Sequence, residues 1–236
     1  KYDLSSADLK ELQSCIVCEN KNLSRLSVAK TPFSGKDIYE EFLVTSLCDN
    51  CGHVFRSIVP SETWFLSQFD YRHKRQLEQN FVPINDAVEV ERLDRYRQLS
   101  QSLAIATRNQ SLEIGFDHVI DFGCGTGAGL KAWDELGIKA RGIEPDESRA
   151  NYGIGLGYDI KLSTWQNYRE KLTATGMVTS IQSLEHFYEP KLFLKHVRGL
   201  VEKGTLLYVE VPDADSFAED WNDALYLAHI SNFTFL

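Results

Sequence analysis

The chain has 236 residues, of which 43% are hydrophobic and 25% charged, so it can bury a full core as one large domain or as a large and a small one. Its formal net charge of −9 argues against a nucleic-acid substrate, because nucleic-acid binding normally needs a basic surface. No apolar run of about 18 residues and no signal-peptide pattern occur, so we expect no membrane partner and a cytoplasmic location.

Four of the five cysteines form two C-x2-C pairs near the N-terminus. Each pair spans one tight turn, and two such turns can bring four thiolates to one tetrahedral ion. Two disulfides are the alternative, which a reducing cytosol disfavours, and iron in a rubredoxin-like site is another. We therefore predict a small zinc-ribbon-like module over residues 1–60, in which the ion is structural and His53 is a bystander. The predicted ligands are Cys15, Cys18, Cys48 and Cys51.

Weaker patterns predict the elements that flank the cysteines. The spacing of Leu4, Leu9 and Leu12 favours a short helix in residues 1–14. Residues 61–112 are expected to form a linker and a helical segment, with a scaffold helix from Asp86 to about Asn109. The aromatic stretch before that helix either packs between modules or contributes to a substrate cleft. The candidates for the cleft are Tyr71 and Arg72.

Residues 118–130 predict a buried strand that runs into a tight glycine turn and then opens a helix. Glycine permits close approach of a ligand to the backbone and allows positive φ. A dinucleotide-binding turn is an alternative, but its G-x-G-x-x-G spacing fits only with Ala128 in the last place.

Asp121, two positions before the first glycine of this turn, distinguishes between the two kinds of cofactor. A carboxylate beside a pyrophosphate is unfavourable, whereas beside an ammonium and a sulfonium it is favourable, so the residue points to S-adenosylmethionine. Glu144 ends a second predicted strand, 23 positions later, where an acid can accept both ribose hydroxyls of an adenosine.

The chain after Glu144 alternates between predicted helices and strands. We expect helices over residues 146–152, 163–172 and 191–201, and strands over 158–162, 177–183 and 205–213. This order predicts an α/β fold, a Rossmann-like core over residues 113–236 in which a parallel-rich sheet is flanked by helices. The sixth and seventh strands usual in such a core are not evident, so we expect it to be truncated at its C-terminus. Trp165 would either stack on the adenine or belong to the core.

The string Asp121-Phe-Gly-Cys-Gly-Thr-Gly127, followed by Gly142-Ile-Glu-Pro-Asp146, resembles the class I S-adenosylmethionine-dependent methyltransferases over about residues 115–213. The resemblance implies an enzyme that transfers a methyl group from S-adenosyl-L-methionine. It also implies that residues after the first, second and fourth strands bind the cofactor. These residues are Asp121, Gly123, Cys124, Gly125, Glu144, Pro145, Gln182 and Ser183.

The cysteine pairs, this core and the late motif His229-Ile-Ser-Asn-Phe-Thr234 together are similar to zinc-containing sugar C-methyltransferases of deoxysugar and polysaccharide pathways. In that group the histidine that begins the late motif and a tyrosine three residues before it are implicated in substrate deprotonation, and they match His229 and Tyr226. His186 is a further candidate base. The expected partner is a small-molecule acceptor, a sugar nucleotide or glycan. That group carries a further C-terminal domain not seen here, so O-methylation, another small-molecule acceptor and a non-catalytic binding module remain open.

Overall fold

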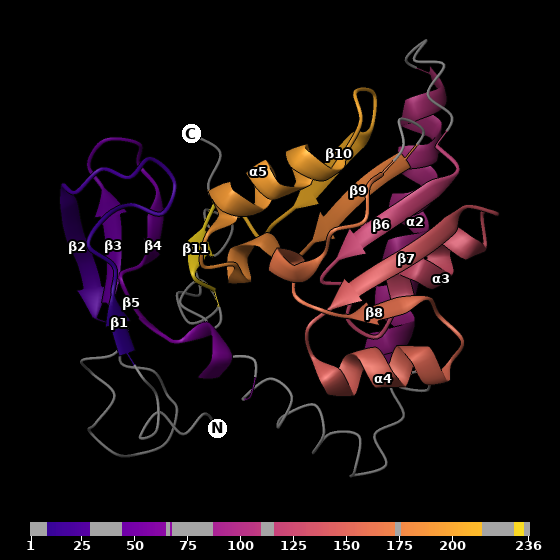
Figure 1. The fold of residues 1–236 in the computed structure, drawn as a ribbon, viewed down its shortest axis with the longest axis horizontal. Helices are drawn as coiled ribbons and strands as arrows, with labels where there is room; N and C mark the ends of the chain where they lie inside the picture. The colour runs from indigo at the N-terminus through magenta and orange to yellow at the C-terminus, as the bar shows by residue number, and fades with distance from the viewer. Residues whose placement is uncertain are drawn as a thin grey trace. The chain divides into compact units, whose positions relative to one another are not determined.

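The computed structural model describes residues 9–28, 44–64, 67, 87–109, 116–172, 176–213 and 229–233. The chain forms two compact units. The first unit contains residues 1–68, 182–194 and 210–236, and the second contains residues 69–181 and 195–209. In Figure 1 the N-terminal strands are indigo and purple, and the sheet of the second unit runs from magenta to orange.

The second unit is built on a five-stranded sheet with the order β10-β9-β6-β7-β8. Its central strand β6 pairs in parallel with β7 and β9, and β7 pairs in parallel with β8. Every residue of β9 is buried, which is the pattern of a strand covered on both faces. The strands are β6 (His118–Phe122), β7 (Lys139–Glu144), β8 (Ile160–Leu162), β9 (Gly176–Ile181) and β10 (Leu206–Glu210).

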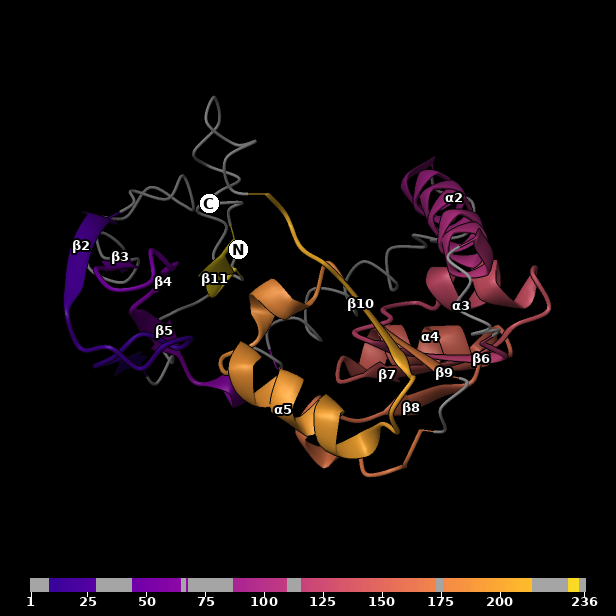
Figure 2. The same ribbon diagram turned by 90° about the horizontal axis from the view of Figure 1, so that it is seen from above.

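Helices cover this sheet. Figure 2 shows α2 (Ala87–Asn109), α3 (Ala128–Asp134) and α4 (Glu147–Gly155) on one face, and the second half of α5 (Pro190–Leu200) toward the other. Phe116, Val119, Trp133 and Met177 form a buried cluster between the sheet and these helices. The α/β fold with a Rossmann-like sheet is therefore confirmed. None of the helices in the described part of the chain is long and apolar enough to cross a membrane.

The first unit contains a four-stranded sheet with the order β11-β4-β3-β2, in which all pairs are antiparallel. Its strands are β2 (Leu23–Val28), β3 (Val44–Cys48), β4 (Val54–Arg56) and β11 (Ser231–Asn232). A separate pair joins β1 (Leu9–Glu11) to β5 (Ile58–Pro60). The edge strand β11 comes from the far end of the sequence, so the late motif is part of the sheet that carries the cysteines.

Two predicted helices are wrong. Of the first, residues 9–14 are described, and residues 9–11 form strand β1 because backbone pairing with β5 overrides the helical spacing of the leucines. The helix expected over residues 163–172 is a single 3-10 turn, η4 (Trp165–Asn167). It stops because Tyr168 adopts an extended conformation and is fully buried. Trp165 is buried too, with the edge of its ring against His196.

Candidate active site

The glycine loop joins β6 to α3 in the second unit, as predicted. Gly123, Gly125 and Gly127 all have positive φ, the conformation that favours glycine. The Gly123 N–H donates to the carbonyl of Ile143 at 2.8 Å, which ties the loop to the neighbouring strand β7. The loop therefore presents its backbone at the carboxyl edge of the sheet, where ligands bind in open α/β folds.

Gly127 has no room for a side chain, which gives a stability prediction. Its φ is 91°, and a Cβ there would lie 2.6 Å from a ring carbon of Tyr158. We expect Gly127→Ala to lower the free energy of unfolding by about 1–3 kcal/mol. Gly155→Ala in α4 is the matched control, because nothing lies within 4 Å of its added Cβ, and it should be neutral or slightly stabilising. Urea unfolding of both variants tests this, and equal effects would contradict it.

Asp121, the next-to-last residue of β6, has a buried carboxyl group. Its Oδ1 accepts a hydrogen bond of 2.7 Å from the Thr179 hydroxyl on β9, and the side chain is 2% exposed. Burial raises the pKa of Asp121 to about 7, with a smaller contribution from the charge of Glu144. A cation bound beside this carboxyl would stabilise its ionised form. No motif in the sequence marks Thr179 as a partner of Asp121. The one sequence feature that could have drawn attention to Thr179 is that it is a polar residue within a strand segment that is fully buried.

The raised pKa of Asp121 predicts a pH dependence of stability. The unfolded carboxyl titrates near pH 4, so the unfolded chain is ionised between about pH 4 and 7 while the folded chain keeps its proton. Stability from this group is fully present below pH 4 and is lost as pH rises through about 7. Asp121→Asn removes this loss, so the variant should gain stability relative to wild type between pH 5 and 8.

Urea unfolding of the apo-protein at pH 5 and pH 8 measures the free energy of unfolding that Asp121→Asn gains over wild type. Asp134→Asn, at an exposed position, is the control. A difference between Asp121→Asn and wild type that stays the same at pH 5 and pH 8 would rule out the assigned titration.

Glu144 ends β7 beside the glycine loop. One carboxylate oxygen accepts the Gly125 N–H at 2.8 Å, and the other accepts the Asp146 N–H at 2.9 Å. Burial raises the pKa of Glu144. Each oxygen has a second lone pair, so both can still accept a hydroxyl. The two backbone contacts fix the carboxylate before a ligand binds.

Cys124 and Pro145, two further predicted cofactor residues, lie in the turns that follow β6 and β7. Cys124 is buried, and its Sγ would lie 2.2 Å from a Cβ added to Gly142, so its side chain fills the space over that glycine. Pro145 is half-buried in the turn between Glu144 and Asp146, the residue that caps α4 by accepting the Arg149 N–H at 3.0 Å.

Gln182 and Ser183 follow β9 directly in sequence but belong to the first unit. Gln182 has a φ of 52°, which is unusual for a residue other than glycine. Its backbone N–H donates to the Glu210 carbonyl at 2.8 Å, and its side-chain amide donates to the Glu210 carboxylate at 3.1 Å. Ser183 is buried and precedes the 3-10 turn η5 (Leu184–His186). A strained backbone held by such contacts is typical of a functional turn.

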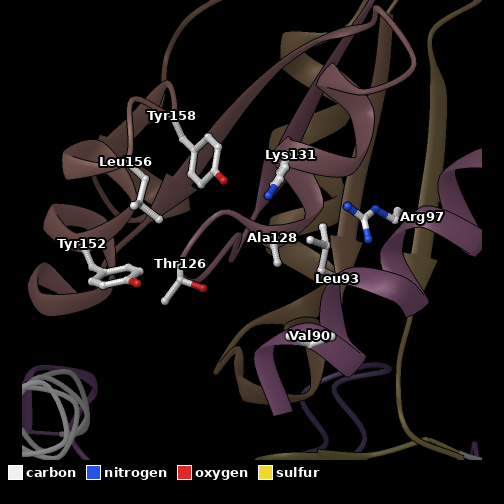
Figure 3. Close-up of a pocket in the computed structure, with 9 residues that line it drawn as sticks. All are labelled: Val90, Leu93, Arg97, Thr126, Ala128, Lys131, Tyr152, Leu156 and Tyr158. Carbon is white, nitrogen blue, oxygen red and sulfur yellow. The ribbon is translucent and has the colours of Figure 1, made fainter. Parts of the chain in front are cut away.

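A cavity of about 240 Å³ lies next to the glycine loop, and Figure 3 shows the side chains that line it. The side chains of Tyr152, Tyr158 and Lys131 converge on it, together with Thr126 from the loop and Val90 from α2. None of the predicted cofactor residues lines this cavity, so it is separate from the edge at which Asp121 and Glu144 end their strands.

Two of the three predicted catalytic residues lie together in the first unit. The rings of His186 and His229 have centroids 5.1 Å apart. Burial lowers the pKa of His229 to about 3, helped by the neighbouring His186 and Arg56, so its imidazole is neutral at pH 7. Burial also raises the pKa of Glu185, whose carboxylate lies 3.7 Å from the His186 ring. The third candidate, Tyr226, lies outside the described residues.

Donor atoms of Glu185, His186 and His229 all lie within 4.8 Å of one another, a spacing that could also hold a metal ion. The guanidinium of Arg56 is buried beside them, and its Nε donates to the His229 carbonyl at 3.2 Å. A fixed positive charge disfavours a divalent cation, so the cluster suits acid–base chemistry better. Arg56 was not predicted, because nothing in its sequence neighbourhood marks it as buried.

The four predicted thiolate ligands converge at the edge of the first unit's sheet. Sulfur–sulfur distances are 3.7 Å for Cys15 and Cys51 and 3.4 Å for Cys18 and Cys48, and all four atoms lie within 4.8 Å of one another. Four sulfurs bound tetrahedrally at about 2.3 Å from zinc would be about 3.8 Å apart. Phe55 packs against the buried pair of cysteines. The cluster therefore has the size and chemistry of a closed tetrathiolate site.

Comparison with protein families matches residues 71–234 to a methyltransferase domain. This stretch is more than half of the chain and contains both acidic strand ends and the late histidine. The chain belongs to this methyltransferase family. No curated protein matches the methyltransferase in sequence.

Solved structures resemble the methyltransferase in fold. The plantazolicin methyltransferase BpumL with SAH is 13% identical, with a TM-score of 0.51 over 71% of this chain and 74% of that one. BpumL with a pentazolic desmethylPZN analog and SAH is 12% identical, with a TM-score of 0.52 over 72% of each chain. Magnesium protoporphyrin IX methyltransferase (ChlM) from Synechocystis PCC 6803 with bound SAM is 14% identical, with a TM-score of 0.44 over 58% of this chain and 71% of that one. The likeness to BpumL supports the class I methyltransferase fold.

Proposed function

We propose that this methyltransferase uses S-adenosyl-L-methionine to methylate a small-molecule acceptor, a sugar or sugar nucleotide, on oxygen or carbon. The observation that carries the proposal is the pair of buried acids, Asp121 and Glu144, at the ends of adjacent parallel strands beside the glycine loop. The match to a methyltransferase family and the similarity of fold to BpumL support the proposal.

The cofactor fits these two acids in different ways. Asp121 would face the cationic methionine part, and its ionised form would be stabilised by the ammonium and the sulfonium. Glu144 would accept the ribose hydroxyls with its remaining lone pairs while the Gly125 N–H holds it in place. When bound, the cofactor supplies an electrophilic methyl group. Binding should therefore release a proton from Asp121 near pH 7.

The acceptor must lose a proton as its oxygen or carbon takes the methyl group. We assign this step to His229, with His186 as its neighbour, because the two imidazole rings lie together, with centroids 5.1 Å apart, and an imidazole nitrogen can accept a proton. Tyr226 is a further candidate through the late motif. The similarity of that motif and of the cysteine pairs to sugar C-methyltransferases supports a sugar acceptor in glycan or secondary-metabolite biosynthesis.

We further propose that Cys15, Cys18, Cys48 and Cys51 bind one structural zinc ion and that residues 1–60 form the zinc module. The sulfur positions fit a tetrahedral ion, and four thiolates leave no open position for water or substrate. Zinc would then stabilise the first unit rather than take part in methyl transfer.

A transfer assay tests the proposed reaction. The purified protein is incubated with methyl-labelled S-adenosylmethionine and a panel of sugar nucleotides, with phenols and carboxylic acids as non-sugar acceptors. Label on a sugar nucleotide supports the assignment. Label only on non-sugar acceptors would keep the enzyme class and overturn the sugar acceptor.

A further inference from the structure

His53 links the second cysteine turn to the late motif. Its backbone carbonyl accepts the Cys48 N–H at 2.9 Å and so closes the turn that holds Cys48 and Cys51. Its ring Nε2 lies 3.3 Å from the Ser231 hydroxyl on β11. The same ring stacks on Phe55 at 5.8 Å between centroids. The position of this ring therefore depends on the shape of the cysteine turn.

Strand β4 holds the residues around His229 by main chain and side chain. Ser231 pairs with Phe55, and the Arg56 N–H donates to the Ile230 carbonyl at 2.9 Å. The Arg56 side chain, 1% exposed, donates from Nε to the His229 carbonyl at 3.2 Å. A long charged side chain buried to this degree has few alternative rotamers, so the contact fixes the His229 backbone.

The same peptide group is also held through its N–H. The Ile230 N–H donates to the Glu185 carbonyl at 2.8 Å, and this bond joins β11 to the turn that carries His186. The peptide group that follows His229 is therefore bonded at its carbonyl to Arg56 and at its N–H to Glu185, two separate elements of the first unit, and the His229 ring lies beside that of His186.

We infer that the four-cysteine module positions His229, with Ser231 and Arg56 as the positioning residues. The inference rests on the proposed role of His229 as the base. The module is then part of the active-site scaffold, since its strand β4 pairs with β11 of the late motif (Figure 1). Its second cysteine turn is followed by His53, whose ring lies beside the Ser231 hydroxyl.

Ser231→Ala tests this link in the full chain with its metal bound. The variant removes one hydroxyl and leaves all four thiolates in place. Ser46→Ala is the matched control, because it removes a buried hydroxyl of the same sheet whose hydrogen-bond partner is Ser57, at 2.8 Å, and not a residue of the late motif. The readout is the imidazole nitrogen resonances of His229, assigned among the six histidines with His229→Gln.

We expect Ser231→Ala to shift the His229 resonances and to lower kcat about tenfold or more with little change in KM, since a displaced catalytic group costs rate rather than binding. Ser46→Ala should leave both unchanged at equal zinc content. Unchanged His229 resonances in Ser231→Ala would overturn the inference. Shifted resonances with normal turnover in both Ser231→Ala and His229→Ala would keep the positioning link and reject the base role, so the two failures are distinguishable.

Discussion

Replacing His229 by alanine should lower the rate of methyl transfer by about 10²- to 10⁴-fold, the usual contribution of a general base. The affinity for S-adenosylhomocysteine should stay within a few-fold, because the acids that we assign to the cofactor lie in the other unit. The low pKa of His229 keeps its imidazole unprotonated from about pH 4 upward, so protonation of His229 should not limit the rate at neutral pH. Turnover with the accepted sugar and calorimetric titration measure the two quantities.

His118→Ala is the control for this prediction. His118 begins β6, at the opposite end of that strand from Asp121, and its ring pairs with the exposed carboxylate of Asp117 at 2.6 Å. It should retain most of the activity. If His186→Ala is inactive while His229→Ala turns over normally, the base is His186. Normal rates in both would remove the acid–base role from this pair.

Replacing Cys48 by serine should abolish stoichiometric zinc binding and unfold the sheet of the first unit. Cys48 is 1% exposed at the end of β3 and packs with Cys15 and Phe55, so the ion and the small core form together. Zinc binding provides on the order of 10 kcal/mol of folding free energy in small thiolate domains, far more than this core supplies. A metal assay and circular dichroism follow the two losses.

Cys124→Ala is the matched control, because Cys124 is also buried but belongs to the second unit. It should keep one zinc per chain. Full zinc content in Cys48→Ser would contradict the tetrathiolate site. Loss of structure on mild reduction of wild type, without loss of metal, would instead support the two-disulfide alternative, and a coloured protein would indicate iron.

The parallel core could be predicted from sequence because each signal was local. Strand β6 carries Asp121 next to its last residue and is followed by glycines, and Glu144 follows at the spacing of the next strand. The structure adds how these parts contact, for example the bond from the Gly125 N–H to Glu144. Thr179 could not be predicted, because its contact with Asp121 joins residues 58 positions apart.

The arrangement of the first unit was harder to predict. The cysteine spacing indicates a shared ion, but a two-residue strand such as β11 has no periodicity to detect. Its pairing with β4 joins positions more than 170 residues apart and is fixed by contacts such as Arg56 with His229. His53 was expected to stand beside the metal site, and its bond to Ser231 could not be inferred from sequence. Long-range pairing of short segments is decided by the folded surroundings rather than by local propensity.

The most direct test of the central claim is a calorimetric titration of the purified protein with S-adenosylhomocysteine and, separately, with NAD. We expect micromolar binding of S-adenosylhomocysteine, no measurable binding of NAD, and at least tenfold weaker binding of S-adenosylhomocysteine by Asp121→Asn. Tighter binding of NAD, or no binding of S-adenosylhomocysteine by wild type, would contradict the assignment of Asp121 and Glu144 to this cofactor.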